Sequence, residues 1–286
     1  MGLSGDADTP KRRQRLSERR DAAIDRVAGA RDAATDHLAD ARAVATDRVA
    51  GARAAASDQL ADARAAAVEL FAKRPKPRLR GVSHQWAFFV SLILGAGLIL
   101  IAAGAEARLA AAIYAASLSA LFGVSALYHR VTWRRPEVRM WMRRLDHAMI
   151  FLLIAGTVTP FTILVLDGPF ATALLVAVWA GAIAGAIVEV AWVGHPKWVA
   201  AIVYIAVGSI GAVGFPVIVA ETGPVAGALI AFGGALYVTG AIIYAAQRPD
   251  PRPGVFGYHE IFHALVIAAA AAHFAAIALF ALPAAG

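Results

Sequence analysis

The sequence predicts an all-α fold, a seven-transmembrane helix bundle, and three observations carry that prediction. The 286 residues are 59% hydrophobic, and their mean hydropathy is +0.63. Only 16% of the residues are charged, whereas a soluble domain carries about a quarter. The charges also gather at one end, because residues 1–80 hold 17 of the 27 Lys and Arg residues and 12 of the 20 acidic residues. A charged N-terminal part therefore precedes a long apolar part.

The apolar part contains seven segments that are long enough to cross a bilayer, which takes about 20 apolar residues. They span residues 84–103, 108–128, 146–166, 170–192, 198–220, 225–246 and 259–282. Trp and Tyr residues cluster near the ends of these segments, where amphipathic rings favour the membrane interface. The connections between the segments are short, so the sequence predicts one membrane domain.

Basic residues mark alternate connections and predict the orientation. Five precede the first segment, and six lie between the second and third. Lys197 lies between the fourth and fifth segments, and Arg248 and Arg252 lie between the sixth and seventh. The opposite connections carry only Arg108. By the positive-inside rule, we expect a cytoplasmic N-terminus and an outside C-terminus in the cell's inner (plasma) membrane. The first 70 residues contain no secretory signal peptide, so the first membrane helix must serve as the targeting element.

The charge and the cysteine content exclude several kinds of site. The net charge of +7 belongs to groups that flank apolar stretches, which indicates anionic lipid headgroups and argues against nucleic acid as a partner. The chain has no cysteine, which excludes disulfides and thiolate metal ligands. Any metal site must therefore be built from histidine and carboxylate side chains.

An eleven-residue repeat organises the N-terminal extension, and it is marked by Arg20, Arg31, Arg42, Arg53 and Arg64. Eleven residues make three turns at about 3.67 residues per turn, so the repeat predicts a long amphipathic helix with an Ala-rich stripe. The stripe favours self-association through residues 20–73 over lipid binding, because membrane-surface helices need bulkier apolar faces. A solvated single helix without a partner is the alternative. The predicted parts are a disordered basic tail (1–19), the repeat helix (20–73), a proline-broken linker (74–81) and the membrane domain (82–286).

Ionisable side chains inside the predicted spans are candidates for function, because burying them in a bilayer is costly. These residues are His129, Asp146, His147, Glu189, His259, Glu260, His263 and His273. His259 and His263 are four residues apart on a helix, so their imidazoles project from one face and can share one Zn²⁺. His129 ends another span at the same predicted depth and can supply a third nitrogen. Three protein ligands with an open fourth position describe a catalytic zinc site.

Two carboxylates compete for the role of general base at this site. Asp146 begins the third span at the depth of the histidines and can accept a proton from a water molecule. Ser125 lies one turn before His129 and can orient water or a substrate carbonyl. Glu260 completes the pattern H-E-x-x-H over residues 259–263, in which metalloproteases use the Glu as base. The residues alone leave both carboxylates open.

The remaining polar residues are expected to have structural roles. We expect His147 to support the site without binding metal, since it points about 100° away from Asp146. His273 lies about 15 Å along the helix from His263, so it is expected to form an interhelical hydrogen bond. Glu189 is expected to snorkel or to pair with Lys197. Two further histidines, at loop or interface positions, are His84 and His195.

Three blocks together resemble the hemolysin III family, the bacterial branch of the progestin and adipoQ receptor superfamily. They are Ser125-Ala-Leu-Tyr-His129, Leu145-Asp146-His147 continuing to Gly156-Thr-Val-Thr-Pro160-Phe161, and His259-Glu-Ile-Phe-His263. The resemblance covers about residues 82–284. It implies a seven-helix fold with the N-terminus inside, zinc on the three histidines, and Asp146 at the water with Ser125 beside it. Because the superfamily does not always have an acidic residue at the position of Glu260, the resemblance favours Asp146 as base.

The resemblance also implies a reaction, because related receptors show ceramidase-type amide hydrolysis. We therefore expect a zinc-dependent membrane hydrolase of lipid amides or esters, with Zn²⁺ as cofactor and membrane lipid as partner. One alternative is a non-catalytic lipid or membrane-state sensor with structural zinc, and another is an intramembrane metalloprotease. A cytolysin role follows from the family name alone, since the loops are short and no amphipathic hairpin is present.

Overall fold

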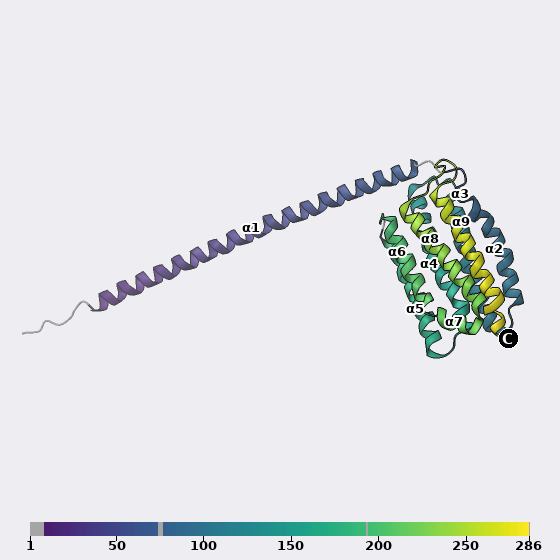
Figure 1. Cartoon of the computed structure of the whole chain (residues 1–286). Helices are drawn as coiled ribbons and strands as arrows, with labels where there is room; N and C mark the ends of the chain where they lie inside the picture. Colours follow the sequence, from purple (N-terminus) through teal and green to yellow (C-terminus); the bar gives the residue numbers. More distant parts are fainter. Residues whose placement is uncertain (1–8, 74–76, 193, 286) are drawn as a thin grey trace, which may run out of the picture. The chain divides into compact units, whose positions relative to one another are not determined.

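The structure is a computed structural model that describes residues 9–73, 77–192 and 194–285, and in these residues it consists of helices and short connections (Figure 1). The chain divides into two units, Met1–Ala67 and Val68–Gly286. The all-α fold is therefore confirmed. The two units are described separately below.

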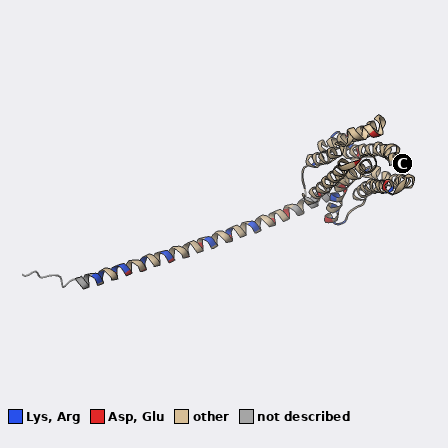
Figure 2. Cartoon of the chain, turned by 90° about the horizontal axis from the view of Figure 1, so that it is seen from below, with Lys and Arg blue, Asp and Glu red and all other residues tan. Residues whose placement is uncertain are grey.

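Helix α1 (Thr9–Lys73) is one continuous helix of 65 residues. Ala and Arg, its main components, have high helix propensity, and two glycines are tolerated within it. Residues 9–19 of the predicted basic tail belong to this helix, and residues 1–8 lie outside the described part. Lys and Arg alternate with Asp and Glu along α1 (Figure 2). Its described side chains are exposed.

Within the described residues of the second unit there are eight further α-helices. They are α2 (Val82–Ile101), α3 (Gly104–Arg130), α4 (Pro136–Leu164), α5 (Gly168–Ala191), α6 (Lys197–Ala212), α7 (Phe215–Thr222), α8 (Pro224–Ala246) and α9 (Tyr258–Ala276). A π-helical turn (Ile277–Ala281) and a 3₁₀ turn (Pro283–Ala285) follow α9. Six of these helices, α9 counted with its π turn, are each long and apolar enough to cross a membrane. The pair α6 and α7 provides the seventh candidate span if the two helices are taken together.

The predicted span 198–220 is not one straight helix. The axis bends by 47° between α6 and α7, at Val213 and Gly214. Pro216 lies in the first turn of α7 and has no backbone N–H to donate to the preceding turn, which favours a break of the helix at this point. Gly223 connects α7 to α8 with φ 86°, a conformation that costs glycine little.

The basic stretch between the second and third spans is shorter than predicted. The connection comprises residues 131–135, and α4 already begins at Pro136, which suits the first turn of a helix. Arg139, Arg143 and Arg144 therefore lie on the first turns of α4, although the sequence placed them in a loop. A longer α4 carries Asp146 and His147 about three turns into the helix.

Helices α3 and α4 are the most deeply buried of the candidate spans and pack against each other and their neighbours. Tyr114 of α3 and Phe151 of α4 are fully buried in this core. The outer faces of the other helices carry large exposed apolar side chains such as Ile93, Leu100 and Ile183. Such a continuous apolar exterior indicates contact with lipid.

The N-terminal end of α2 is attached to the connection between α8 and α9. The backbone N–H groups of Arg78 and Leu79 donate to the carbonyls of Gly254 and Val255, each at 3.1 Å. Of the predicted linker 74–81, residues 74–76 lie outside the described part, and the rest forms a turn that ends at Gly81. This attachment brings the first turn of α2 beside the first turn of α9.

Candidate metal centre

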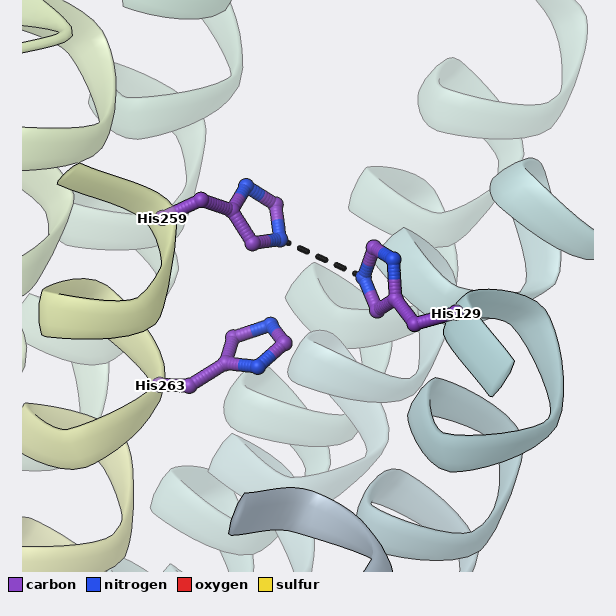
Figure 3. Close-up of side chains that lie close together, drawn as sticks. All are labelled: His129, His259 and His263. Atoms are coloured by element: carbon purple, nitrogen blue, oxygen red, sulfur yellow. Dashed lines mark hydrogen bonds between the residues drawn. The ribbon is translucent and has the colours of Figure 1, made fainter. Parts of the chain in front are cut away.

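Three histidines meet where the last turn of α3 lies against the first turns of α9. His129, His259 and His263 are all buried, and their ligand-capable atoms lie within 4.8 Å of one another. His259 and His263 project from one face of α9, one turn apart, and their rings face that of His129 on α3 (Figure 3). The structure thus brings together residues that are 130 positions apart, as the sequence predicted.

Local hydrogen bonds fix the first turn of α9. The Gly257 N–H donates to Oε2 of Glu260 at 2.8 Å, which satisfies a backbone donor that a helix start leaves unpaired. The other oxygen, Oε1, forms an ion pair with Arg80, at the entry to α2. Both carboxylate oxygens of Glu260 are therefore engaged away from the three histidines. This geometry speaks against Glu260 as the general base.

The histidines fit one transition-metal ion. The Nε2 atoms of His129 and His259 are 3.2 Å apart. Two nitrogens at about 2.0–2.1 Å from a tetrahedral zinc ion would lie about 3.3 Å apart, close to this value. The Nδ1 atom of His263 is buried and has no hydrogen-bond partner among the described residues. Imidazole nitrogens suit zinc, copper, iron and nickel, so the donor set indicates a transition metal without selecting one.

Asp146 and Ser125 adjoin the three histidines. Oδ2 of Asp146 is 3.5 Å from Nε2 of His129, and the carboxylate is buried. Oγ of Ser125 lies 2.8 Å from Nδ1 of His84. The imidazole of His84 in turn stacks on that of His263, with ring centroids 3.7 Å apart and an interplanar angle of 9°. A polar cluster thus connects α2, α3, α4 and α9.

His84 does not lie in a loop, which was one of the two positions expected for it. It lies in the first turn of α2, is 3% exposed, and contacts both a candidate metal ligand and Ser125. A signal was present in the sequence, since His84 begins the first predicted span, at the predicted depth of the other histidines. Only the attachment of α2 to the α8–α9 connection turns the side chain inward.

Two cavities adjoin the cluster. The smaller one, of about 20 Å³, has room for one water molecule. It is lined by His84, Leu121, Ser125, Asp146, His147, Ile150, Tyr204, Tyr244, His259, Phe262, His263 and Val266. The larger one, of about 270 Å³, is mostly apolar and lies among α3, α4, α6, α8 and α9. Because both cavities share Leu121, Ile150, Tyr204, Phe262 and Val266 as lining residues, they are direct neighbours.

Glu189, which was expected to snorkel or to pair with Lys197, has other partners in the contacts that the structure describes. Its carboxylate contacts His147 and His195 instead, and Nζ of Lys197 donates to the hydroxyl of Tyr258 at 2.5 Å. His195 is buried in spite of its position in a connection. The three groups come from α4, α5 and the α5–α6 connection, so a sequence pattern could not pair them.

His273 behaves as expected. Its Nε2 atom lies 3.1 Å from the carbonyl oxygen of Ile230 on α8, which makes an interhelical hydrogen bond. It takes no part in the cluster around the three histidines.

Comparison with known proteins assigns the membrane part of the chain to a family. The family model described as "Haemolysin-III related" matches residues 72–274. "Hemolysin-3" of Bacillus cereus is 31% identical over 179 residues, which are 63% of this chain and 78% of that protein. The "Hemolysin-3 homolog" of Bacillus subtilis (strain 168) is 29% identical over 162 residues, 57% of this chain and 72% of that protein.

A human protein is also similar. The "Monocyte to macrophage differentiation factor" of Homo sapiens is 28% identical over 173 residues, 59% of this chain and 69% of that protein. The match of the family model extends over most of the described helices from α2 to α9, including all three histidines. On these grounds the chain is a member of the haemolysin-III related family of multi-pass membrane proteins.

Proposed function

We propose that this protein is a zinc-dependent membrane hydrolase that cleaves an amide or ester bond of a lipid. One observation carries the proposal: three buried histidines stand beside Asp146, next to an apolar cavity of about 270 Å³. Metal ligands, a carboxylate and an apolar binding space are the parts that hydrolysis of a lipid requires. The catalytic residues we propose are Asp146 and Ser125.

His129, His259 and His263 would hold the metal. When bound there, Zn²⁺ would supply Lewis acidity and would make a nearby water molecule easier to deprotonate. Asp146 accepts the proton from a water in the small cavity, since its carboxylate lines that cavity. Ser125 donates its hydroxyl hydrogen to the substrate carbonyl oxygen, while Nδ1 of His84 holds the hydroxyl in place from the other side.

The lining of the larger cavity is the reason for proposing an acyl chain as the bound group. Its lining is almost entirely apolar, with side chains such as Leu153, Ile154 and Val238. Some of its lining residues, Ser209 and Ala212 among them, are exposed on the outside of the bundle. A lipid could therefore enter from the bilayer, with its carbonyl at the histidines and its chain in the cavity.

The arrangement in the cell follows from the charges. We propose that the N-terminus is cytoplasmic, that the site faces the cytoplasmic side, and that the protein lies in the inner (plasma) membrane, because Lys and Arg gather at that end of the spans. We also propose self-association through the repeat helix 20–73, since its Ala-rich stripe contains exposed Leu38, Val49 and Leu60. Zinc and membrane lipid are the proposed partners.

A lipid or membrane-state sensor with a structural metal is the second candidate. The observation that favours it is the position of the histidines, which would let a metal join α3 to α9 in the manner of a structural cross-link. Lytic activity, which the names of the bacterial relatives suggest for those proteins, is not part of the proposal. A metalloprotease is disfavoured, because Glu260 is occupied by Arg80 and Gly257.

The test begins with metal analysis of the purified full chain and a screen of N-acyl and O-acyl lipids. We expect zinc in the wild type and in Asp146→Asn, but hydrolysis only in the wild type, with a loss of roughly 10²–10⁴-fold when the base is removed. Asp167 follows α4 and has an exposed carboxylate. Its replacement, Asp167→Asn, is the matched control and should keep both the zinc content and the hydrolysis of the wild type. A zinc-loaded wild type that hydrolyses no lipid in the screen would favour the sensor.

A further inference from the structure

A second buried polar cluster lies beside the metal centre and has no part in the mechanism above. It consists of Glu189 on α5, His147 on α4 and His195 in the α5–α6 connection, and we name it the Glu189 cluster. Their exposed fractions are only 6%, 7% and 7%. Burying three ionisable groups at the end of a span is costly. Such groups are therefore candidates for a function, which in membrane proteins includes proton transfer.

The geometry of the cluster is that of a chain. Oε1 of Glu189 is 2.5 Å from Nδ1 of His147, and Oε2 is 3.0 Å from Nε2 of His195. Each imidazole has a second nitrogen, which contacts a group other than Glu189. Nε2 of His147 lies 3.4 Å from the hydroxyl of Tyr244, and Nδ1 of His195 lies 3.2 Å from the carbonyl oxygen of Pro196. Groups that can exchange protons therefore lie in a row from Tyr244 to the α5–α6 connection.

One end of this chain reaches the candidate metal centre. His147 and Tyr244 line the small cavity together with Asp146 and the histidines of α9. The other end lies in the connection after α5, where Trp192 and Gly194 are exposed. The ionisable groups around the cluster include Tyr204, Tyr244, Asp146, Arg143 and His259.

A second metal site does not explain the cluster. Metal ligands must converge on one point, and within the described residues only His129, His259 and His263 do so. In the Glu189 cluster the two imidazoles face different oxygens of one carboxylate. Such an alternation of imidazole and carboxyl groups suits the transfer of a proton from one to the next.

We propose that the Glu189 cluster is a proton path between the small cavity and the α5–α6 connection, and this inference rests on the proposed function. A water in the small cavity passes a proton to Nε2 of His147, whose Nδ1 proton moves to Oε1 of Glu189. The protonated carboxyl of Glu189 then turns about its Cγ–Cδ bond, so that the oxygen carrying the proton faces His195 and passes it to Nε2 of that residue. Nδ1 of His195 then releases a proton to water at the connection. Each group gains one proton and loses one, and no electrons move.

The path can be tested without a substrate. The full-length protein is loaded with Co²⁺, whose visible absorption responds to the protonation of its surroundings, and the absorbance is followed after a rapid pH jump. We expect Glu189→Gln and His147→Gln to bind as much Co²⁺ as the wild type and to reach the same final spectra, but to relax at least tenfold more slowly. His273→Gln, a histidine outside the cluster, is the matched control and should relax as the wild type does.

The outcomes separate this inference from the proposed function. Unchanged relaxation in both Glu189→Gln and His147→Gln, with normal Co²⁺ content, would overturn the proton path and leave the hydrolase proposal standing. Loss of Co²⁺ from these variants and from His195→Gln, but not from His273→Gln, would show that the cluster only supports the fold, which also overturns the path. Slowed relaxation of Glu189→Gln and His147→Gln, together with a wild type that hydrolyses no lipid, would support the path and refute the proposed reaction. A wild type that binds neither Co²⁺ nor Zn²⁺ would refute the proposed function and, with it, the path that rests on it.

Discussion

Replacement of Glu260 by Gln separates the two roles that the sequence left open for this residue. In the structure, one carboxylate oxygen pairs with Arg80 and the other accepts the Gly257 N–H. Gln keeps an oxygen for the Gly257 N–H and loses the charge that faces Arg80. The change should therefore weaken the fold and leave the metal centre intact.

The magnitude follows from these contacts. A hydrogen bond to a charged group contributes about 1.5–3 kcal/mol to stability, and the Glu260 side chain is 3% exposed while that of Arg80 is 19% exposed, so screening is modest. At roughly 2–4 °C per kcal/mol, Glu260→Gln should lower the Tm by roughly 3–12 °C. Glu260→Ala also removes the acceptor of the Gly257 N–H, and the loss of a buried partner then costs about 3–5 kcal/mol.

The assay combines thermal unfolding in detergent, metal analysis and lipid hydrolysis below the Tm of the variants. We expect Glu260→Gln to unfold at a lower temperature, with zinc content and turnover within about twofold of the wild type. The reasoning is refuted if Glu260→Gln keeps its Tm and its zinc but loses about 10²-fold or more in turnover, the effect of removing a general base. Asp146→Asn should show the opposite pattern, with normal zinc content and lost turnover.

Three further predictions concern the metal, the cavity and the repeat helix. His263→Ala should lose the bound metal, and a chelator should lower the Tm of the wild type but not that of this variant; equal responses of the two proteins would contradict a metal on His263. Ala241→Phe places a ring in the larger cavity and leaves less room for a long acyl chain. Hydrolysis of long-chain lipids should therefore fall at least tenfold, while hydrolysis of short-chain analogues should stay within about threefold of the wild-type rate. A uniform loss for all chain lengths would argue against the cavity as the acyl site. Deletion of residues 1–73 should reduce the number of chains per particle, obtained by light scattering, and leave the metal content per chain unchanged. An unchanged number of chains would exclude self-association through α1.

Local physical chemistry made much of this protein predictable. A bilayer demands long apolar helices, so hydropathy alone located the candidate spans and separated them from the charged repeat. The spacing of His259 and His263 put two imidazoles on one helical face, and alternation of span direction placed His129 at the same depth. The break between α6 and α7 was locally encoded as well, by Gly214 and Pro216, although the apolar run concealed it.

The partners of the buried polar groups were decided by tertiary structure alone. His84 joins the candidate metal centre because the turn before α2 is hydrogen-bonded to the connection before α9, a contact over 170 positions apart in the chain. Glu189 binds two histidines because α4, α5 and the α5–α6 connection meet there. Hydropathy sets the depth of a side chain in the membrane, whereas its direction around the helix and its neighbours depend on how the helices pack. The sequence by itself therefore determined which residues lie at the level of the site, and packing decided which of them touch.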